Sequence, residues 1–308
     1  MSILVTGGTG YIASYLLRAL VERGEEVIAY DVAPETASIQ DIAQKCVVIR
    51  GDVRNLVHVL HVMKEYRVNS VVHTAALLTT ASQENPLSAL QVNVEGSLNL
   101  FEAARLMDAE RFVFTSSQAV FGETEARPIE EDYPKNPNTI YGVTKLTCEH
   151  FGINYANTYG LNFVALRFPV LYGPGRVRGM GTFATLVENP LRNQAARIER
   201  GGDQKYEPLY AKDAARSLML ALYAKNLQHR IFNIGTEEFV TLQDVSREVR
   251  KFVPNAQIDI RGGLDTAYAS RGPMKIDRAR QELGYEPEYD LEKGIEDYVR
   301  ILRQTLWQ

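Results

Sequence analysis

Cysteine is scarce in this chain of 308 residues, which contains only Cys46 and Cys148. Neither cysteine has a partner at the spacing of a metal-binding motif. Two thiols also cannot form the disulfide framework that holds small secreted domains together. We therefore expect no cysteine-based metal site, and we expect a protein of a reducing compartment, the cytoplasm.

An excess of one charge is also lacking, because 34 Lys and Arg residues face 38 Asp and Glu residues, for a net charge of −4. This balance gives no reason to expect a nucleic acid or a membrane as a partner. No apolar run approaches the roughly 18 residues of a membrane-spanning helix. The five histidines are scattered, and no metal site is predicted.

What the chain does contain is a regular alternation of strand-like and helical segments. The strand-like runs are nearly continuously apolar, as in parallel strands that are buried on both faces. They lie at 2–6, 26–31, 46–52, 69–75, 111–117 and 162–168. The helical patterns between and after them lie at 11–23, 55–66, 86–107 and 141–159, and later at 211–225, 241–252, 276–283 and 290–305. The alternation predicts an α/β fold with a Rossmann-type doubly wound parallel sheet.

The pattern loosens after residue 175, so two parts of the chain are expected to differ in role. Residues 1–175 are predicted to form the dinucleotide-binding domain that carries the catalytic residues. Residues 176–308 are predicted to form mainly a smaller C-terminal substrate-binding lobe, with some segments returning to the first domain.

The segment TGGTGYIA, residues 6–13, follows the first predicted strand and opens the first predicted helix. Gly7 and Gly10 leave room for the backbone to approach a pyrophosphate, to which the helix offers its N-terminal amides and its dipole. Ala13 replaces a third glycine, and its methyl group is tolerable there. This context predicts a dinucleotide-binding turn.

Asp31 ends the second predicted strand and favours NAD over NADP. Its carboxylate can accept hydrogen bonds from the ribose hydroxyls and would repel a 2′-phosphate. The residues that follow, VAPETAS, contain no cation that could neutralise such a phosphate. Asp52 ends the third strand, where it could lie near the adenine or cap the next helix.

The predicted chemistry centres on YGVTK, residues 141–145, and on the serine pair in TSSQAVFG, residues 115–122. Tyr141 and Lys145 are four residues apart and so share one face of a helix. An ammonium beside a phenol lowers the phenol pKa from about 10 toward neutrality. The phenol can then exchange a proton with a carbinol or a carbonyl group.

Together these segments resemble the extended short-chain dehydrogenase/reductases, a group of NAD-dependent epimerases, dehydratases and sugar dehydrogenases. The resemblance covers the first 175 residues in the order and spacing of the family, and only loosely the remainder. Besides the segments already quoted, it rests on GDV (51–53), HTAA (73–76), NVEGSLNL (93–100) and LRFPVLYGPG (166–175).

The resemblance implies roles for individual residues. Tyr141 would be the acid/base, Lys145 would hold the nicotinamide ribose and tune Tyr141, and Ser117 would hydrogen-bond the reacting oxygen. Asn93 would be the asparagine that the family carries in the fourth helix. The NAD site would comprise Gly7, Gly10, Tyr11, Ile12, Asp31, Asp52, Val53, Ala75, Ala76, Leu77, Ser116, Tyr141, Lys145, Phe168 and Val170.

The substrate site is less well defined by the sequence. The loops at 78–85, 118–127 and 174–209 contain Thr79, Gln118, Arg176 and Arg178, which suit a hydroxyl-rich or acidic ligand. The two arginines could equally belong to a solvated loop.

Departures from the family pattern narrow the reaction. Gln118 and Ala119 replace the acidic pair of the family dehydratases, which argues against dehydration. Val170 replaces an asparagine, and Tyr206 an arginine, that contact the sugar nucleotide in related epimerases. Because hydrogen bonds to charged groups contribute about 1.5–3 kcal/mol each, these losses disfavour a diphosphate. Arg176, Arg178, Arg192 and Lys212 are possible replacement donors.

Three functions therefore stay open, with different weight. An NAD-dependent dehydrogenase of a sugar, sugar acid or similar polar carbinol is the leading hypothesis, and a UDP-sugar 4-epimerase with tightly bound NAD is the alternative. A non-catalytic NAD(H)-sensing protein is disfavoured because such members typically lose the Tyr or the Lys.

The family also implies a homodimer, in which the helices at 86–107 and 141–159 form a four-helix bundle with their copies. One stripe on these helices contains Leu90, Val94, Leu98, Phe101 and Arg105, and another contains Cys148, Phe151 and Tyr155.

Overall fold

The computed structural model describes residues 1–176, 181–265 and 269–306. Its centre is a seven-stranded sheet in the order β10-β6-β5-β4-β1-β2-β3, in which neighbouring strands run parallel. The strands are β1 (Ser2–Thr6), β2 (Glu26–Asp31), β3 (Val47–Arg50), β4 (Ser70–His73), β5 (Arg111–Ser117), β6 (Phe163–Phe168) and β10 (Ile231–Asn233). The predicted doubly wound sheet is confirmed, and its strand order reverses between β1 and β4. Ligands of such sheets bind in the crevice at this reversal, beyond the carboxyl ends of the strands.

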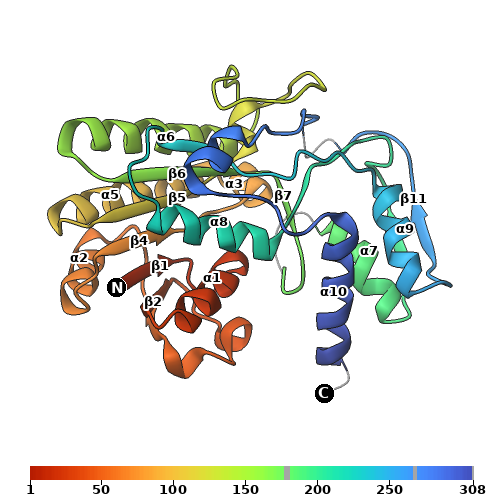
Figure 1. Cartoon of the computed structure of the whole chain (residues 1–308), viewed down its shortest axis with the longest axis horizontal. Coiled ribbons are helices and arrows are strands. Elements are labelled where there is room, and N and C mark those ends of the chain that lie inside the picture. The colour runs from red at the N-terminus through yellow and green to blue at the C-terminus, as the bar shows by residue number, and fades with distance from the viewer. Residues whose placement is uncertain (177–180, 266–268, 307–308) are drawn as a thin grey trace.

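Helices cover both faces of the sheet (Figure 1). On one face lie α1 (Tyr11–Glu22) and α8 (Ala211–Tyr223), whose apolar residues share a core with Ile3, Val5 and other side chains of that face. On the other face α2 (Leu56–Glu65), α5 (Gly96–Leu106) and α6 (Ile140–Tyr159) pack on the alternate residues, such as Leu4 and Phe112. Burial on both faces explains why the strands are almost continuously apolar.

The segment predicted as one helix over 86–107 is not a regular α-helix. It comprises α4 (Pro86–Ala89), a π-helical stretch η3 (Leu90–Glu95) and then α5. The wider turn is preceded by α3 (Thr79–Glu84), which was not predicted. Periodicity over the whole segment does not reveal such a local widening, which is frequent at functional sites.

The second lobe has its own core, which is formed by α7 (Thr182–Leu191), α9 (Leu242–Phe252), α10 (Leu291–Leu306) and the paired strands β8 (Ala196–Ile198) and β11 (Ile258–Ile260). Two short strands, β7 (Val170–Tyr172) and β9 (Pro208–Tyr210), pair beside it. The predicted helices near 211–225, 241–252 and 290–305 are present, whereas α7 was not predicted. At 276–283 the structure has a shorter π-helical turn, η5 (Ala279–Leu283). Two elements that follow residue 175 return to the first domain: β10 is a strand of its sheet, and α8 packs on one face of that sheet.

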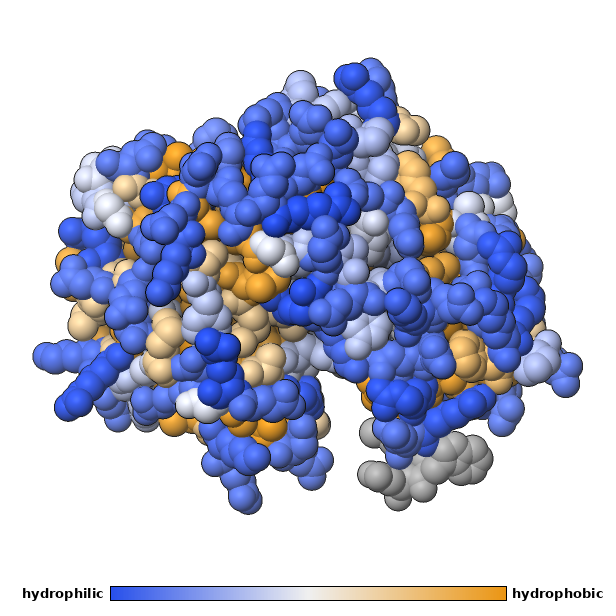
Figure 2. Space-filling model, in the orientation of Figure 1, coloured by the Kyte–Doolittle hydropathy of each residue, from blue (hydrophilic) through white to orange (hydrophobic). Residues whose placement is uncertain are grey.

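Short 3-10 turns complete the first domain: η1 (Thr36–Ile39), η2 (Ala43–Lys45) and η4 (Gln118–Phe121). Hydrophilic residues cover most of the face shown in Figure 2, with apolar residues scattered among them. Within the described ranges, no helix has both the length and the apolar character needed to cross a membrane.

Candidate active site

The glycine turn between β1 and α1 is built so that only glycine fits at its start. Gly7 has φ +65°, and a Cβ there would lie 2.8 Å from the backbone nitrogen of Ala75. A Cβ on Gly8 would lie 2.6 Å from the Cα of Ala29. The turn is thus pressed against the ends of β4 and β2. Gly10, the N-cap of α1, has no side chain to satisfy the first amides of the helix, which stay available for an anion.

Asp31 lies at the carboxyl end of β2 and faces this turn. One carboxylate oxygen accepts hydrogen bonds from the backbone N–H (3.2 Å) and the hydroxyl (3.0 Å) of Thr9, and the other accepts from the N–H of Ala33 at 3.2 Å. These contacts fix the carboxylate beside the uncapped start of α1. The glycine cradle, the open amides and this acid therefore fit the pyrophosphate and ribose of NAD.

Asp52 is paired rather than free. Its carboxylate binds Arg54, and this contact lowers the pKa of Asp52. The residue that caps α2 is Asn55, which accepts from the N–H of His58 at 3.0 Å, so the interpretation of Asp52 as the helix cap is wrong. The adjacent Val53 is buried, and a Cβ on Gly96 would meet its side chain at 2.5 Å.

Tyr141 and Lys145 lie in the first two turns of α6, which begins at the cap Thr139. The Lys145 side chain is buried, and its ammonium donates to the carbonyl oxygen of Thr115 at 2.6 Å. The ammonium lies 5.6 Å from the ring centroid of Tyr141 and 4.6 Å from that of Phe114. Burial lowers the pKa of Lys145 to about 8. The pair thus lies at the carboxyl end of β5, where the crevice opens.

Asn93 occupies the π-helical stretch η3 and connects three elements. Its side-chain oxygen accepts from the N–H of Leu77 at 2.8 Å, and its amide donates to the carbonyl of Leu77 and to the Thr144 hydroxyl at 3.1 Å. Its backbone carbonyl accepts from Ser97 and Cys148. Asn93 therefore ties the loop after β4 to the turn of α6 that carries Lys145.

The two serines at the end of β5 contact different partners, because successive side chains of a strand point to opposite faces of the sheet. The Ser117 hydroxyl accepts from the N–H of Ala119 at 3.1 Å and is half-buried. The Ser116 hydroxyl is buried and donates to Glu149 at 2.5 Å. The Ser116 side chain is thus committed to α6.

His73, at the end of β4, is a buried polar residue that sequence reasoning left without a role. Its ring nitrogens contact the hydroxyls of Thr6 at 2.7 Å and Ser97 at 2.9 Å. Burial holds its pKa well below the usual value. The imidazole is therefore neutral and joins β1, β4 and α5.

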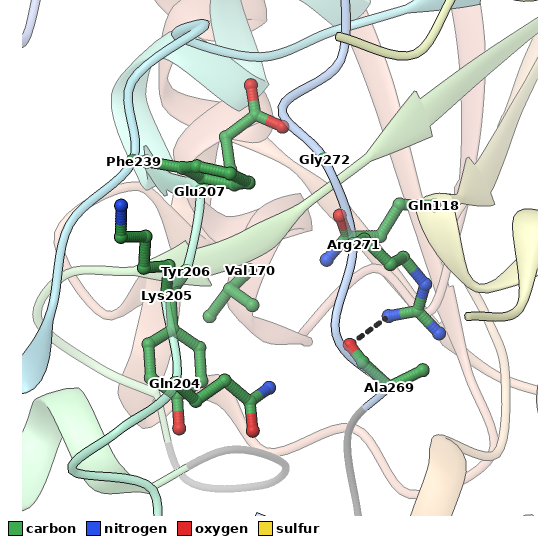
Figure 3. Close-up of a pocket in the computed structure, with 10 residues that line it drawn as sticks. All are labelled: Gln118, Val170, Gln204, Lys205, Tyr206, Glu207, Phe239, Ala269, Arg271 and Gly272. Atoms are coloured by element: carbon green, nitrogen blue, oxygen red, sulfur yellow. Dashed lines mark hydrogen bonds between the residues drawn. The ribbon is translucent and has the colours of Figure 1, made fainter. Parts of the chain in front are cut away.

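A pocket lies where residues of the second lobe meet the starts of η4 and β7 (Figure 3). Of the predicted substrate and cofactor residues, it brings together Gln118 and Val170, with Tyr206 beside them. The remaining lining residues, which sequence reasoning missed, are Gln204, Lys205, Glu207, Phe239, Ala269, Arg271 and Gly272. They come from segments far apart in the chain, so no local pattern could have joined them.

Arg271 gives this pocket a cationic wall. Its guanidinium donates to the carbonyl of Gly122 at 2.6 Å and contacts the carbonyl of Ala269 at 3.5 Å. Burial lowers its pKa to about 10. No ion pair of Arg271 occurs among the residues that the structure describes. A guanidinium held by neutral carbonyls can still bind an anionic group.

Glu207 lines the same pocket and holds the segment that carries Arg271. Its carboxylate accepts from the backbone N–H groups of Met274 (2.9 Å), Glu237 (3.0 Å) and Thr236 (3.1 Å). Burial raises the pKa of Glu207 to about 8, whereas the three donors favour the ionised form. All three contacts are structural, so this carboxylate is not free to act as an acid on a substrate.

The other predicted residues lie away from this pocket or outside the described ranges. Arg176 donates to the carbonyl of Leu171 at 2.6 Å, and its guanidinium lies 5.6 Å from the ring centroid of Tyr11 at the start of α1. Arg178 falls outside the described residues. Thr79 begins α3. Phe168 is buried at the end of β6.

The open start of α1 and the placement of Asp31 make the crevice a dinucleotide site, which puts the chain among the Rossmann-fold enzymes that use a nicotinamide cofactor. The model of the NAD dependent epimerase/dehydratase family matches residues 3–235. The chain belongs to this family, and hence to the extended short-chain dehydrogenase/reductases. It is an NAD-dependent enzyme of the epimerase and dehydratase type.

Relatives match over essentially the whole length. A putative UDP-glucose 4-epimerase from Methanocaldococcus jannaschii is 30% identical over 98% of this chain and 99% of that protein. The structure of the Thermotoga maritima UDP-glucose 4-epimerase with UDP-glucose has a TM-score of 0.91 at 26% identity, covering 99% of this chain and all of that one. The complex of the Thermus thermophilus UDP-glucose 4-epimerase with NAD has a TM-score of 0.89 at 28% identity, covering 98% of this chain and 99% of that one.

Proposed function

We propose that this chain oxidises or reduces a secondary carbinol or ketone of a sugar-like substrate, with NAD as the hydride carrier and Tyr141 as the acid/base. The observation that carries the proposal is the anchoring of Lys145 on the carbonyl of Thr115 at 2.6 Å. This contact holds the turn of α6 that carries Lys145 against the carboxyl end of β5, and Tyr141 lies one turn earlier on the same helix. When bound, NAD supplies the hydride acceptor.

The residues of the chain divide the remaining work. The Ser117 hydroxyl would orient the reacting oxygen, and Tyr141 would take its proton during oxidation or return it during reduction. The ammonium of Lys145 would favour the phenolate of Tyr141 electrostatically and bind the nicotinamide ribose. The uncapped amides of α1 and the carboxylate of Asp31 would hold the dinucleotide.

The pocket favours a substrate with a single anionic group, as in a sugar acid. Arg271 supplies one half-buried guanidinium, and Lys205 adds an exposed cation. Tyr206, in the place of the arginine that related epimerases use, is buried and contacts the carbonyl of Gly201. Val170 offers the pocket no donor. These features support a dehydrogenase of a sugar or sugar acid.

A UDP-sugar 4-epimerase is the second candidate, and the whole-length likeness to UDP-glucose 4-epimerases favours it. Dehydration has no support, because Gln118 replaces the acid and Glu207 is held by three backbone donors. A panel of sugars, sugar acids and UDP-sugars tests the choice by NADH absorbance and product stereochemistry. Net NADH from a free sugar or sugar acid supports the dehydrogenase. Inversion of a UDP-sugar without net NADH supports the epimerase, and neither result on the full panel contradicts both.

We also propose that the chain forms a homodimer through the helical segment 86–107, which comprises α4, η3 and α5, and through α6. Val94, Phe101 and Cys148, which were expected on the interface stripes, are buried in the core against the sheet and cannot contact a second copy. The outer face keeps exposed apolar side chains, namely Leu87, Leu90, Val143, Phe151 and Tyr159. A groove on α6 is lined by Thr147, His150, Phe151, Asn154, Tyr155, Thr158 and Tyr159. Light scattering should give twice the chain mass at micromolar concentration, and a monomer mass would contradict the dimer.

A further inference from the structure

Behind the proposed catalytic pair lies an ion pair that the mechanism above does not use. Glu149 of α6 and Arg167 of β6 are both almost fully buried, with side-chain exposures of 2% each. Two parallel hydrogen bonds join them, from Nε to Oε1 at 2.8 Å and from Nη2 to Oε2 at 2.7 Å. Arg167 also donates to the carbonyl of Glu131 at 2.9 Å.

The position of Glu149 connects this pair to Lys145. The two residues are four apart on α6 and therefore lie on one face of the helix. Lys145 donates to the carbonyl of Thr115, and Glu149 accepts from the hydroxyl of the next residue, Ser116. Consecutive residues at the end of β5 thus hold consecutive turns of α6.

Stability alone gives little reason to bury such a pair. Two charges lose their hydration on burial, and replacing a buried ion pair by apolar residues of similar volume is often neutral or stabilising. A buried carboxylate next to a buried ammonium has a second effect, however. In a medium of low polarity it strongly favours the charged form of the amine.

We propose, on the basis of the function proposed above, that Glu149 is a positioning residue that keeps Lys145 protonated and fixes the Tyr141–Lys145 pair against the ends of β5 and β6. Arg167 completes the arrangement, because its two hydrogen bonds hold the Glu149 carboxylate in place. Glu149 itself does not touch the reacting atoms.

The other groups around Lys145 do not supply this charge. Cys148, on the same helix, is buried with a raised pKa and is a neutral thiol. His73 approaches from β4 and is neutral. Around Glu149 the further charges are cationic: Arg167 from β6 and Lys135 from the loop before α6. Tyr141, whose ring centroid lies 5.6 Å from the ammonium, is the group that Lys145 would tune. Among the described carboxylates, Glu149 is the one that lies one turn from Lys145 on the same face of α6.

The variant Glu149→Gln removes the charge at nearly constant volume. Residues four apart on a helix lie about 5–6 Å from each other. At about 6 Å and an effective dielectric constant of about 20, the lost attraction corresponds to about two pH units. The alkaline pH at which Lys145 stops binding the cofactor ribose should move down by that amount. NADH affinity can be measured by fluorescence titration between about pH 6 and pH 10. The pH at which this affinity falls, called the alkaline limb below, is measured without any substrate. The pH–rate profile should move with it.

Three further variants separate charge from geometry. Ser116→Ala removes one hydrogen bond but keeps the Glu149 charge. Because Ser116 was expected in the NAD site, this variant is judged by the pH of its alkaline limb and not by its NADH affinity at any one pH, and that limb should stay at the wild-type pH. Glu149→Gln combined with Arg167→Met removes both charges. The alkaline limb of this double variant should therefore lie between that of Glu149→Gln and that of the wild type. Glu199→Gln breaks an exposed ion pair with Arg261 in the second lobe and should change nothing. Circular dichroism checks that each variant is folded.

The proposal is overturned if Glu149→Gln and the double variant both keep the wild-type limb of NADH affinity, or if Ser116→Ala moves it as far as Glu149→Gln does. If Glu149→Gln does not fold, the double variant decides: a limb below that of the wild type supports the proposal, and an unchanged limb overturns it. Failure of the proposed function would look different. The NADH limb would then shift as expected while no carbinol or ketone was turned over.

Discussion

Replacing Gly7 by alanine should separate the needs of the cofactor site from those of an ordinary turn, and Gly24 provides the matched control. Both glycines have a left-handed backbone, with φ +65° at Gly7 and φ +79° at Gly24. An alanine in this conformation costs roughly 1–2 kcal/mol at either position. Around Gly24 no atom lies within 4 Å of an added Cβ, so Gly24→Ala should cost only this amount.

At Gly7 the added methyl meets the backbone of Ala75 at 2.8–2.9 Å, about 1 Å inside an ordinary carbon contact. Overpacking of this kind adds about 1–3 kcal/mol, so Gly7→Ala should lower the free energy of unfolding by that much more than Gly24→Ala. The turn must also move away from β4, which should weaken NADH binding at least tenfold, or about 1.4 kcal/mol. Urea unfolding and NADH fluorescence titration measure the two effects. If Gly7→Ala kept the wild-type NADH affinity and were as stable as Gly24→Ala, the argument that the cofactor site needs a glycine at position 7 would be refuted.

Three other predictions concern the cofactor and the catalytic pair. Tyr141→Phe should lower turnover on the true substrate by about 10²–10⁴-fold while NADH affinity changes little, because only the proton relay is lost; near-full turnover would contradict the proposed mechanism. NAD should bind at least tenfold more tightly than NADP, about 1.4 kcal/mol, and Asp31→Ala should reduce this preference in calorimetric titrations. Lys145→Met should abolish turnover but raise the free energy of unfolding at pH 7 by up to about 3 kcal/mol, since the pKa of the buried lysine is lowered to about 8. Between pH 8 and the ordinary lysine pKa the unfolded wild-type chain binds more protons than the folded chain, so the wild type becomes more stable as the pH rises. The extra stability of Lys145→Met over the wild type should therefore shrink through that window, as urea unfolding at several pH values can check.

The first domain could be predicted from the sequence because its signals are local. A strand buried on both faces must be apolar at successive positions, as in Ser2–Thr6 and Phe163–Phe168, and the glycine turn follows β1 directly. The π-helical stretch at Leu90–Glu95 could not be predicted, since one widened turn hardly changes the helical period. The faces of the helices were also ambiguous. Phe101 and Leu90 fall on one predicted stripe, yet Phe101 is buried and Leu90 is 54% exposed.

The pocket depends on contacts that no local pattern contains. Arg271 donates a hydrogen bond to the carbonyl of Gly122, which lies 149 residues earlier in the chain. Glu207 holds that segment through Met274 and also holds the loop at Thr236 and Glu237. The substrate-facing wall is therefore assembled by long-range packing, whereas the cofactor-facing wall comes from short strand-to-helix turns. One signal was nevertheless present in the sequence: Glu149 follows Lys145 by one helical turn, and an acid on a buried face requires a partner.

This division between the two walls bears on how the substrate is chosen. The dinucleotide turn, Asp31 and the Tyr141–Lys145 pair belong to the sheet and the helices packed on it, and in the proposed function they carry the hydride chemistry. The pocket wall belongs to segments 204–207 and 269–272, which the buried carboxylate of Glu207 keeps together. A change of the wall, such as Tyr206 where related epimerases use an arginine, can therefore alter the substrate without moving the catalytic pair. For this reason the whole-length likeness to UDP-glucose 4-epimerases is a guide to the cofactor and the reaction type, while the proposal of a substrate with one anionic group rests on Arg271, Lys205 and Tyr206.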